Sequence, residues 1–191
     1  ELEYWDHALG IAQRWRERAG LPREVKWDGV RARLSALPVK DGVYLAHENC
    51  PQTFTGRNRD HPSMLYACGM LAGEGIDREA MRRTLRKVFD VWRWEDTWGW
   101  DFPAVAMTAA RLGQPELAVD ALFLESPKNT WRANGHNWQR ANLPVYLPGN
   151  GALLSAAAMM AAGWQGSPAE PNPGFPKKGW SVRWEGIERQ L

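Results

Sequence analysis

The chain has 191 residues, 44% of them hydrophobic and 24% charged, which is typical of one globular domain with a sizeable core. Its 24 basic and 22 acidic residues give a formal net charge of +2. This balance gives no electrostatic case for a nucleic-acid partner or a membrane surface. No apolar run reaches the roughly 20 residues that a membrane-spanning helix needs.

The start of the chain and its cysteines set two further expectations. The helical pattern begins at Glu1 without an initiator methionine or a signal peptide, so we expect a processed or fragmentary chain whose N-terminus does not indicate localisation. Cys50 and Cys68 are expected to be buried free thiols, with a disulfide between them as the alternative. The four histidines lack metal-ligand spacing, so neither a metal nor another cofactor is predicted.

Tryptophan is over-represented, with 12 copies against 4 tyrosines and 5 phenylalanines. An indole ring offers a large flat apolar face and one N–H donor. A sugar ring presents C–H groups on its face and hydroxyls around its rim, so tryptophan suits a carbohydrate ligand. The alternative is a tryptophan-rich core between helices.

In chain order, apolar spacing first predicts helices over residues 2–18 and 25–37. A possible short strand over 43–45 and a long polar loop over 47–60 follow. The next helices are expected over 61–71 and, after Asp77 as N-cap, over 79–94.

A polar and aromatic connection over 95–101 leads into the second half, where three more helices are expected over 103–112, 115–123 and 152–164. A second long loop, 125–148, separates the last two. We expect residues 167–191 to form an irregular tail rich in proline and glycine, with a possible edge strand over 180–184.

Short turns and long loops alternate between these helices, which predicts an all-α array of helical hairpins with an inner and an outer ring. The helical-hairpin domain is expected to span residues 1–166. The two long loops should then gather at one end of the array.

Several stretches resemble the C-terminal half of six-hairpin glycosidases, near glycoside hydrolase families 65 and 95. They are Trp-Gly-Trp-Asp-Phe-Pro from Trp98, Ala-Met-Thr-Ala-Ala-Arg-Leu-Gly from Ala106, Asn-Gly-His-Asn from Asn134, Gln139-Arg140, Leu143-Pro144, Tyr-Leu-Pro-Gly-Asn-Gly from Tyr146, and Ala-Ala-Ala-Met-Met-Ala-Ala-Gly-Trp from Ala156.

The resemblance implies a partial (α/α)6 toroid, because a full ring has twelve barrel helices and this chain has about seven helical segments. It therefore implies a companion chain, a longer parent protein or an oligomer. In such toroids the loops before the inner helices build the active site; here these are the loop ending Asp60-His61, the connection 95–101 and the turn 149–151. Fucosidase-like members carry an aspartate where this chain has Pro148, which argues against a fucosidase-type mechanism.

Glycoside cleavage needs a proton donor and a second carboxylate, about 5–5.5 Å apart in retaining enzymes and about 6.5–9.5 Å apart in inverting ones. Asp101 is the first candidate, because its aromatic neighbours favour the protonated form that a general acid requires. Asp60 and Glu48 are the others. Asp101 or Asp60 could instead cap a helix, and Glu48 could cap a turn.

Other side chains are candidates for binding a carbohydrate. Trp98 and Trp100 could stack on a sugar ring. Imidazole, amide and guanidinium groups could contact its hydroxyls, and the candidates are His61, His136, Asn137, Gln139, Arg140 and Asn150. The alternative for the amide-rich residues is a loop held by side-chain to backbone hydrogen bonds.

The expected function is a glycoside hydrolase that acts on oligosaccharides by carboxylate acid/base catalysis, with this chain as a C-terminal portion of the catalytic domain. A glycoside phosphorylase is an alternative, in which the turn 149–151 at a helix start could hold phosphate. A non-catalytic carbohydrate-binding or scaffold helical module is another, and a scaffold would carry tryptophan on its outer helix faces.

Overall fold

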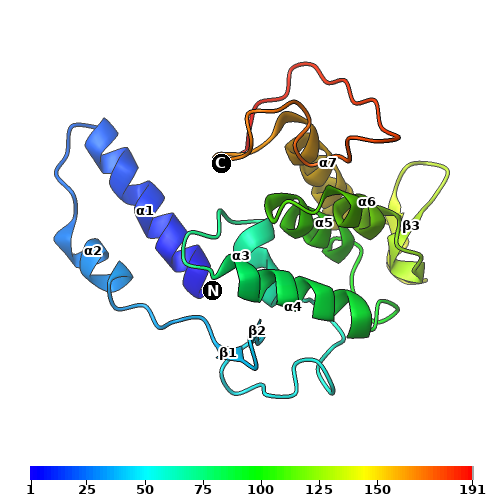
Figure 1. Ribbon diagram of the computed structural model, residues 1–191, viewed down its shortest axis with the longest axis horizontal. Coiled ribbons are helices and arrows are strands. Elements are labelled where there is room, and N and C mark those ends of the chain that lie inside the picture. Colours follow the sequence, from blue (N-terminus) through cyan, green and yellow to red (C-terminus); the bar gives the residue numbers. More distant parts are fainter. Residues whose placement is uncertain (191) are drawn as a thin grey trace.

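The computed structural model describes residues 1–190, and its fold is mostly helical, as predicted (Figure 1). Over this range the α-helices are α1 (Leu2–Arg18), α2 (Val25–Arg31), α3 (Tyr66–Gly69), α4 (Arg78–Val91), α5 (Asp101–Arg111), α6 (Pro115–Phe123) and α7 (Leu147–Ala162). Two small antiparallel pairs join β1 (Val39–Lys40) to β2 (Val43–Tyr44), and β3 (Thr130–Trp131) to β4 (Asn137–Trp138). Short 3₁₀ turns lie at Ser63–Leu65 and Pro127–Asn129.

Local capping chemistry accounts for the boundaries that were predicted correctly. Asp77 caps α4, and its carboxylate accepts hydrogen bonds from the backbone N–H groups of Glu79 and Ala80 at 2.8 and 3.0 Å. Proline opens α6 at Pro115, where its missing N–H costs nothing.

Other boundaries differ from the prediction. α2 ends at Arg31 rather than near residue 37. It contacts α1 but buries none of its residues, and a short helix with so little burial is marginal in water. α5 and α7 begin at Asp101 and Leu147, ahead of the expected residues 103 and 152, because proline is tolerated inside a first turn. The helix expected over 61–71 is a 3₁₀ turn followed by the four-residue α3.

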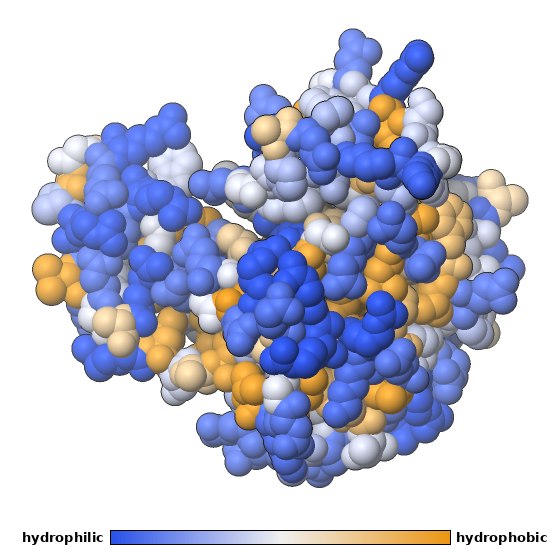
Figure 2. All heavy atoms as spheres, viewed as in Figure 1, coloured by the Kyte–Doolittle hydropathy of each residue, from blue (hydrophilic) through white to orange (hydrophobic). Residues whose placement is uncertain are grey.

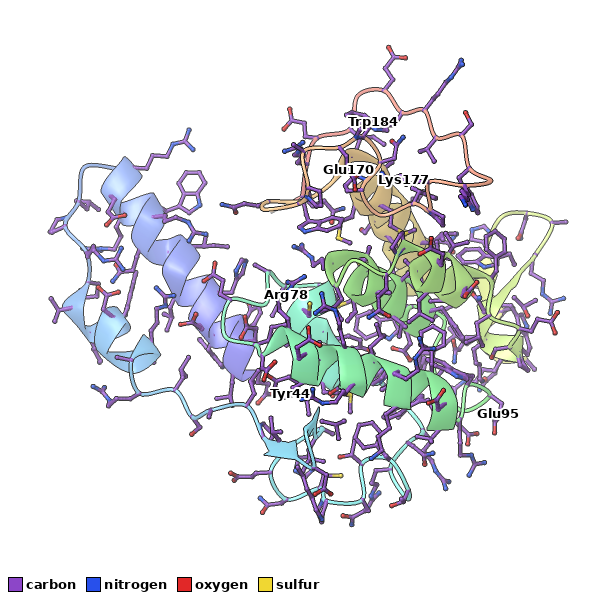
Figure 3. All side chains as sticks on the ribbon, in the orientation of Figure 1. Tyr44, Arg78, Glu95, Glu170, Lys177 and Trp184 are labelled. Carbon is purple, nitrogen blue, oxygen red and sulfur yellow. The ribbon has the colours of Figure 1, made fainter. Side chains whose placement is uncertain are left out.

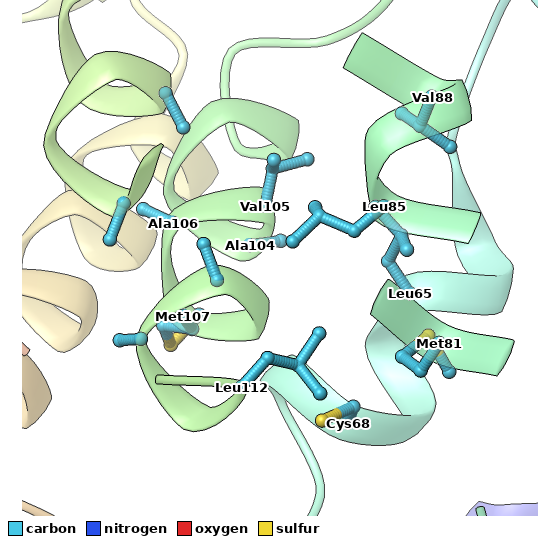
Figure 4. Close-up of a cluster of buried hydrophobic side chains, with 14 of the residues drawn as sticks. Leu65, Cys68, Met81, Leu85, Val88, Ala104, Val105, Ala106, Met107 and Leu112 are labelled. Carbon is cyan, nitrogen blue, oxygen red and sulfur yellow. The ribbon is translucent and has the colours of Figure 1, made fainter. Parts of the chain in front are cut away.

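The core is built around α5, in which every residue from Asp101 to Arg111 is buried. α3, α4, α6 and α7 all contact this helix. In Figure 4, Leu85 and Val88 of α4 face Ala104 and Val105 of α5. Cys68 lies in the same cluster, and both cysteines are free and buried, which confirms the expectation for them.

Helices α1 and α2 form an arm beside this body (Figure 1). On α1 a polar residue is buried and two large apolar residues are exposed, the reverse of the usual pattern. Gln13 is fully buried, whereas Trp5 and Trp15 are 54% and 63% exposed. Gln13 bridges the two helices, because its amide donates to the carbonyl of Glu24 and accepts from the N–H of Glu24, both at 2.8 Å. The rings of Trp5 and Trp15 therefore lie away from the contacts of Gln13 that join α1 to α2.

Helix α7 also leaves apolar surface uncovered, although its sequence is apolar on nearly every side. Leu147 and Leu154 are 60% and 71% exposed. Figure 2 shows such apolar surface, in orange, on the body. A helix that is apolar on all sides is normally buried within a protein or a membrane. None of the helices in residues 1–190 is long and apolar enough to cross a bilayer.

The tail over residues 167–190 contains no strand at 180–184, so that expectation is wrong. Strand-like pairing occurs instead at Gln190, whose carbonyl accepts from the N–H of Gln165 at 2.7 Å. Glu170 and Lys177 form an ion pair at 3.3 Å within the tail (Figure 3). Leu191, the last residue of the expected tail, lies outside the described residues.

Candidate functional site

The Asp101 carboxylate at the start of α5 is the centre of a buried polar cluster. Its side chain is fully buried and accepts from four groups, namely His61 Nδ1 at 2.9 Å, the Trp98 backbone N–H at 2.8 Å and the hydroxyls of Thr97 and Tyr66. None of these donors belongs to α5, so Asp101 holds the preceding connection rather than capping the helix. A carboxylate without solvent access cannot reach a substrate, which argues against the expected role of Asp101 as catalytic acid.

His61 lies between two carboxylates. Its Nδ1 faces Asp101, and its Nε2 lies 3.6 Å from Asp60 Oδ1. The Trp100 indole nitrogen is 3.0 Å from the same Nδ1, so that atom can either donate to Asp101 or accept from Trp100. The bond to Asp101 is charge-assisted and the stronger of the two, which assigns the proton to Nδ1.

The pKa of His61 is raised above its ordinary value. Burial lowers it, but the hydrogen bond and charge of Asp101, together with the charge of Asp60, outweigh burial. Burial, reinforced by the charge of Asp101, also raises the pKa of Tyr66 and of Tyr146.

The raised pKa of His61 makes stability depend on pH. Protonated His61 contributes stability that is fully present below its ordinary pKa of about 6.5 and is lost as pH rises through the higher folded-state value. We expect the free energy of unfolding to fall by at most about 1 kcal/mol as the pH rises over this range, because the ring is partly exposed and solvent screens its charge. Urea unfolding from pH 6 to 9 measures it, and a His61→Gln variant should lack the decline; an equal decline in that variant would assign it to another group.

Asp60 adopts an unusual backbone conformation directly before His61. Its φ is +83°, in the left-handed region that non-glycine residues rarely occupy outside turns and functional sites. The Asp60 carbonyl accepts from the indole N–H of Trp92 at 3.0 Å and lies 2.9 Å from the Thr97 hydroxyl. The Trp98 indole donates to Asp60 Oδ1 at 3.0 Å. These contacts hold an exposed carboxylate in one place.

A cavity of about 950 Å³ opens beside this carboxylate. Its wall comes from the loop after β2 and from the connection before α5. The lining residues are Ala46, His47, Asn49, Cys50, Gln52, Gly56, Arg57, Arg59, Asp60, His61, Asp96 and Trp98. Of the predicted site residues, Asp60, His61 and Trp98 therefore meet in one concave surface.

Gln139 joins the second long loop to this site. Its buried amide accepts from the Gly99 N–H at 2.9 Å and donates to the Thr97 carbonyl at 3.1 Å. Asp60, in the first long loop, binds Trp98 of the same connection. The two loops thus meet at one end of the body, as the sequence predicts, but Gln139 binds backbone groups and is not available to a sugar.

Asn137 and Asn150 also stabilise the loop instead of lining the cavity. Asn137 is fully buried and donates to the carbonyls of Lys128 and Thr130 at 3.1 and 3.3 Å, while its Oδ1 has no hydrogen-bond partner within residues 1–190. Asn150 accepts from the Asn137 N–H at 3.1 Å and donates to the Gly135 carbonyl at 2.8 Å. The alternative weighed from sequence, a loop held by its own amides, is the correct one for both.

The other predicted residues are placed as follows. The Arg140 guanidinium lies over the Trp98 ring, 5.6 Å from its centroid, and covers part of the expected stacking face. Trp100 packs edge-on against His61 and is not part of the cavity wall. His136 and Glu48 are also absent from that wall.

Sequence reasoning missed several residues of the site. Thr97 and Tyr66 bind Asp101, and Tyr146 packs on Trp98 with 5.5 Å between ring centroids. The sequence around these three residues gives no sign of their role, because a hydroxyl that binds a buried carboxylate cannot be told in sequence from one that faces solvent. Arg57 and Arg59 were detectable, since both lie in the loop already assigned to the site.

The chain matches no protein-family model, and comparisons with curated proteins and with solved structures also found no match.

Proposed function

We propose that the cavity binds a carbohydrate and that this chain is part of a glycoside hydrolase in which Asp60 is the acid/base carboxylate. The observation that carries the proposal is the fixed, solvent-facing carboxylate of Asp60 beside His61 and Trp98 in the wall of the cavity. Sugar sites combine an aromatic ring with polar groups that bind hydroxyls.

The helix arrangement supports an arc of a toroid. α5 contacts α3 on one side and α7 on the other, as consecutive inner helices would, and α4 and α6 connect them. The uncovered apolar residues on α1 and α7, such as Trp15 and Leu154, are what an incomplete ring would leave. A companion chain, a longer parent protein or an oligomer would cover them.

The contacts of Asp60 suit a proton acceptor. Oδ1 is occupied by the Trp98 indole and faces His61, whereas Oδ2 forms no hydrogen bond or ion pair within residues 1–190. That oxygen can take a proton from a water or sugar hydroxyl held in the cavity. Asp96 is the other carboxylate of the wall and pairs with Arg93 at 2.9 Å.

We expect Asp60→Asn to lower oligosaccharide turnover about 10²–10⁴-fold, because the amide cannot accept the proton, while the binding constant changes little. The measurement is turnover, together with calorimetric binding, on the intact protein with an oligosaccharide panel. Asp120→Asn, an exposed carboxylate on α6, is the matched control and should leave both unchanged. Full turnover in Asp60→Asn would remove Asp60 from the chemistry, and no binding to any sugar would overturn the proposal.

A non-catalytic carbohydrate-binding module is the second candidate. It is favoured by the full burial of Asp101, which leaves Asp60 and Asp96 as the carboxylates of the cavity wall. Sugar binding by the wild type without any turnover would select it. The phosphorylase alternative is weakened, because the Gly149 N–H donates to the Tyr146 carbonyl at 3.0 Å and is not free for phosphate.

A further inference from the structure

Two arginines in the cavity wall have no use in the proposed chemistry. Arg57 and Arg59 line the cavity, are exposed, and form no side-chain hydrogen bond or ion pair within residues 1–190. By contrast, Arg93 at the neighbouring connection is paired with Asp96 at 2.9 Å. The cavity therefore holds two guanidinium groups whose donors are unoccupied.

Asn58, the residue between the two arginines, is anchored to the end of α4. Asn58 between them is buried; its amide donates to the Val91 carbonyl and its own carbonyl accepts from the Arg93 N–H at 2.9 Å. The anchored Asn58 thus fixes the backbone between Arg57 and Arg59, and both of these residues line the same cavity.

We propose that the cavity selects an acidic carbohydrate, in which the carboxylate of a uronic acid unit binds to Arg57 and Arg59. This inference rests on the proposed function and names its substrate class. A guanidinium offers a planar fork of donors that matches a carboxylate, and such charge-assisted bonds are strong.

Two acidic residues of the cavity wall limit where an anion can lie. Asp60 lies next to Arg59 in sequence, and Asp96 also lines the cavity. An anion is repelled by these carboxylates and attracted by the two guanidinium groups. The anion is therefore placed at the arginine side, with the neutral sugar ring toward Trp98.

Calorimetry of the intact protein with uronic acid oligosaccharides, each beside its methyl ester, tests the inference. The ester keeps the sugar and removes the charge, so we expect the acid to bind at least tenfold more tightly. The double variant Arg57→Gln/Arg59→Gln should lose this preference, and Arg57→Lys/Arg59→Lys should keep part of it. Arg14→Gln/Arg33→Gln, which removes one exposed arginine on α1 and one just after α2, is the charge-matched control and should behave as the wild type.

Each other outcome has a defined meaning. Equal binding of acid and ester, or an unchanged preference in the Arg57→Gln/Arg59→Gln variant, overturns the inference and leaves the proposed function standing. Tighter binding of inorganic phosphate than of any uronate also overturns it and indicates an anion site of another kind. No binding of any sugar, acidic or neutral, overturns the proposed function together with the inference.

Discussion

Asp101→Asn should destabilise the intact protein by about 1–3 kcal/mol, the cost of leaving a buried polar group without its hydrogen-bond partner. The carboxylate accepts from donors on both oxygens, whereas an amide offers one acceptor and one donor group. In one orientation the new NH₂ group faces the Trp98 N–H, and in the other it faces His61 Nδ1. The first orientation leaves a donor buried against a donor, and the second requires the His61 tautomer whose Nδ1 accepts a hydrogen bond.

Urea unfolding with an unchanged slope measures this loss as a shift of the midpoint. Asp60→Asn is the matched control and should cost less than about 1 kcal/mol, because the side chain is exposed and asparagine tolerates positive φ. If Asp101→Asn unfolds at the wild-type midpoint, the carboxylate is not structural, and its role as catalytic acid would have to be reconsidered.

Gly99→Ala should also be strongly destabilising, by about 3 kcal/mol, the upper part of the range for overpacking. A Cβ at this position would lie 1.8 Å from Asn137 Oδ1. Asn137 cannot retreat, since its amide is bound to the Lys128 carbonyl and Gly149 closes the other side, where a built Cβ would lie 2.4 Å away. The glycine thus makes room for the side chain of Asn137.

Chemical denaturation can show whether the loss comes from the clash with Asn137 or from alanine at position 99 in itself. The variants to compare are Gly99→Ala, Asn137→Ala and the double variant Gly99→Ala/Asn137→Ala. The double variant should lose less stability than the sum of the two single changes, because the second change removes the obstacle. Gly151→Ala in α7 is the control; no atom lies within 4 Å of its built Cβ, and we expect a gain of up to about 1 kcal/mol. Additive losses would contradict the proposed contact.

The helix boundaries that could be predicted are those determined by interactions between residues close together in the sequence. The Asp77 cap and Pro115 at the start of α6 act within a few residues, so their effect is readable without tertiary structure. The end of α2 could not be read in this way, because it depends on how much of the helix is buried against the rest of the protein, and none of its residues is fully buried. The resemblance to six-hairpin glycosidases remains a prediction.

The candidate site was only partly predictable for the same reason. Asp60, His61 and Trp98 lie where loops precede helices, and they do meet at one cavity. Gln139 and Asn137 have the side chains that sugar recognition uses, but an amide that binds a carbonyl looks identical in sequence to one that binds a hydroxyl. Burial, which depends on the assembled helices, decides between the two.

The contacts that build the site join residues far apart in the chain. His61 and Asp101 are 40 residues apart, as are Gly99 and Gln139. Such nonlocal pairs form only once the intervening chain has folded, so the denatured ensemble retains no partial site. A ligand of the cavity will therefore bind only the native state and raise its stability by RT ln(1 + [L]/Kd). A rise in melting temperature is thus a direct screen for ligands and requires no assumption about the reaction.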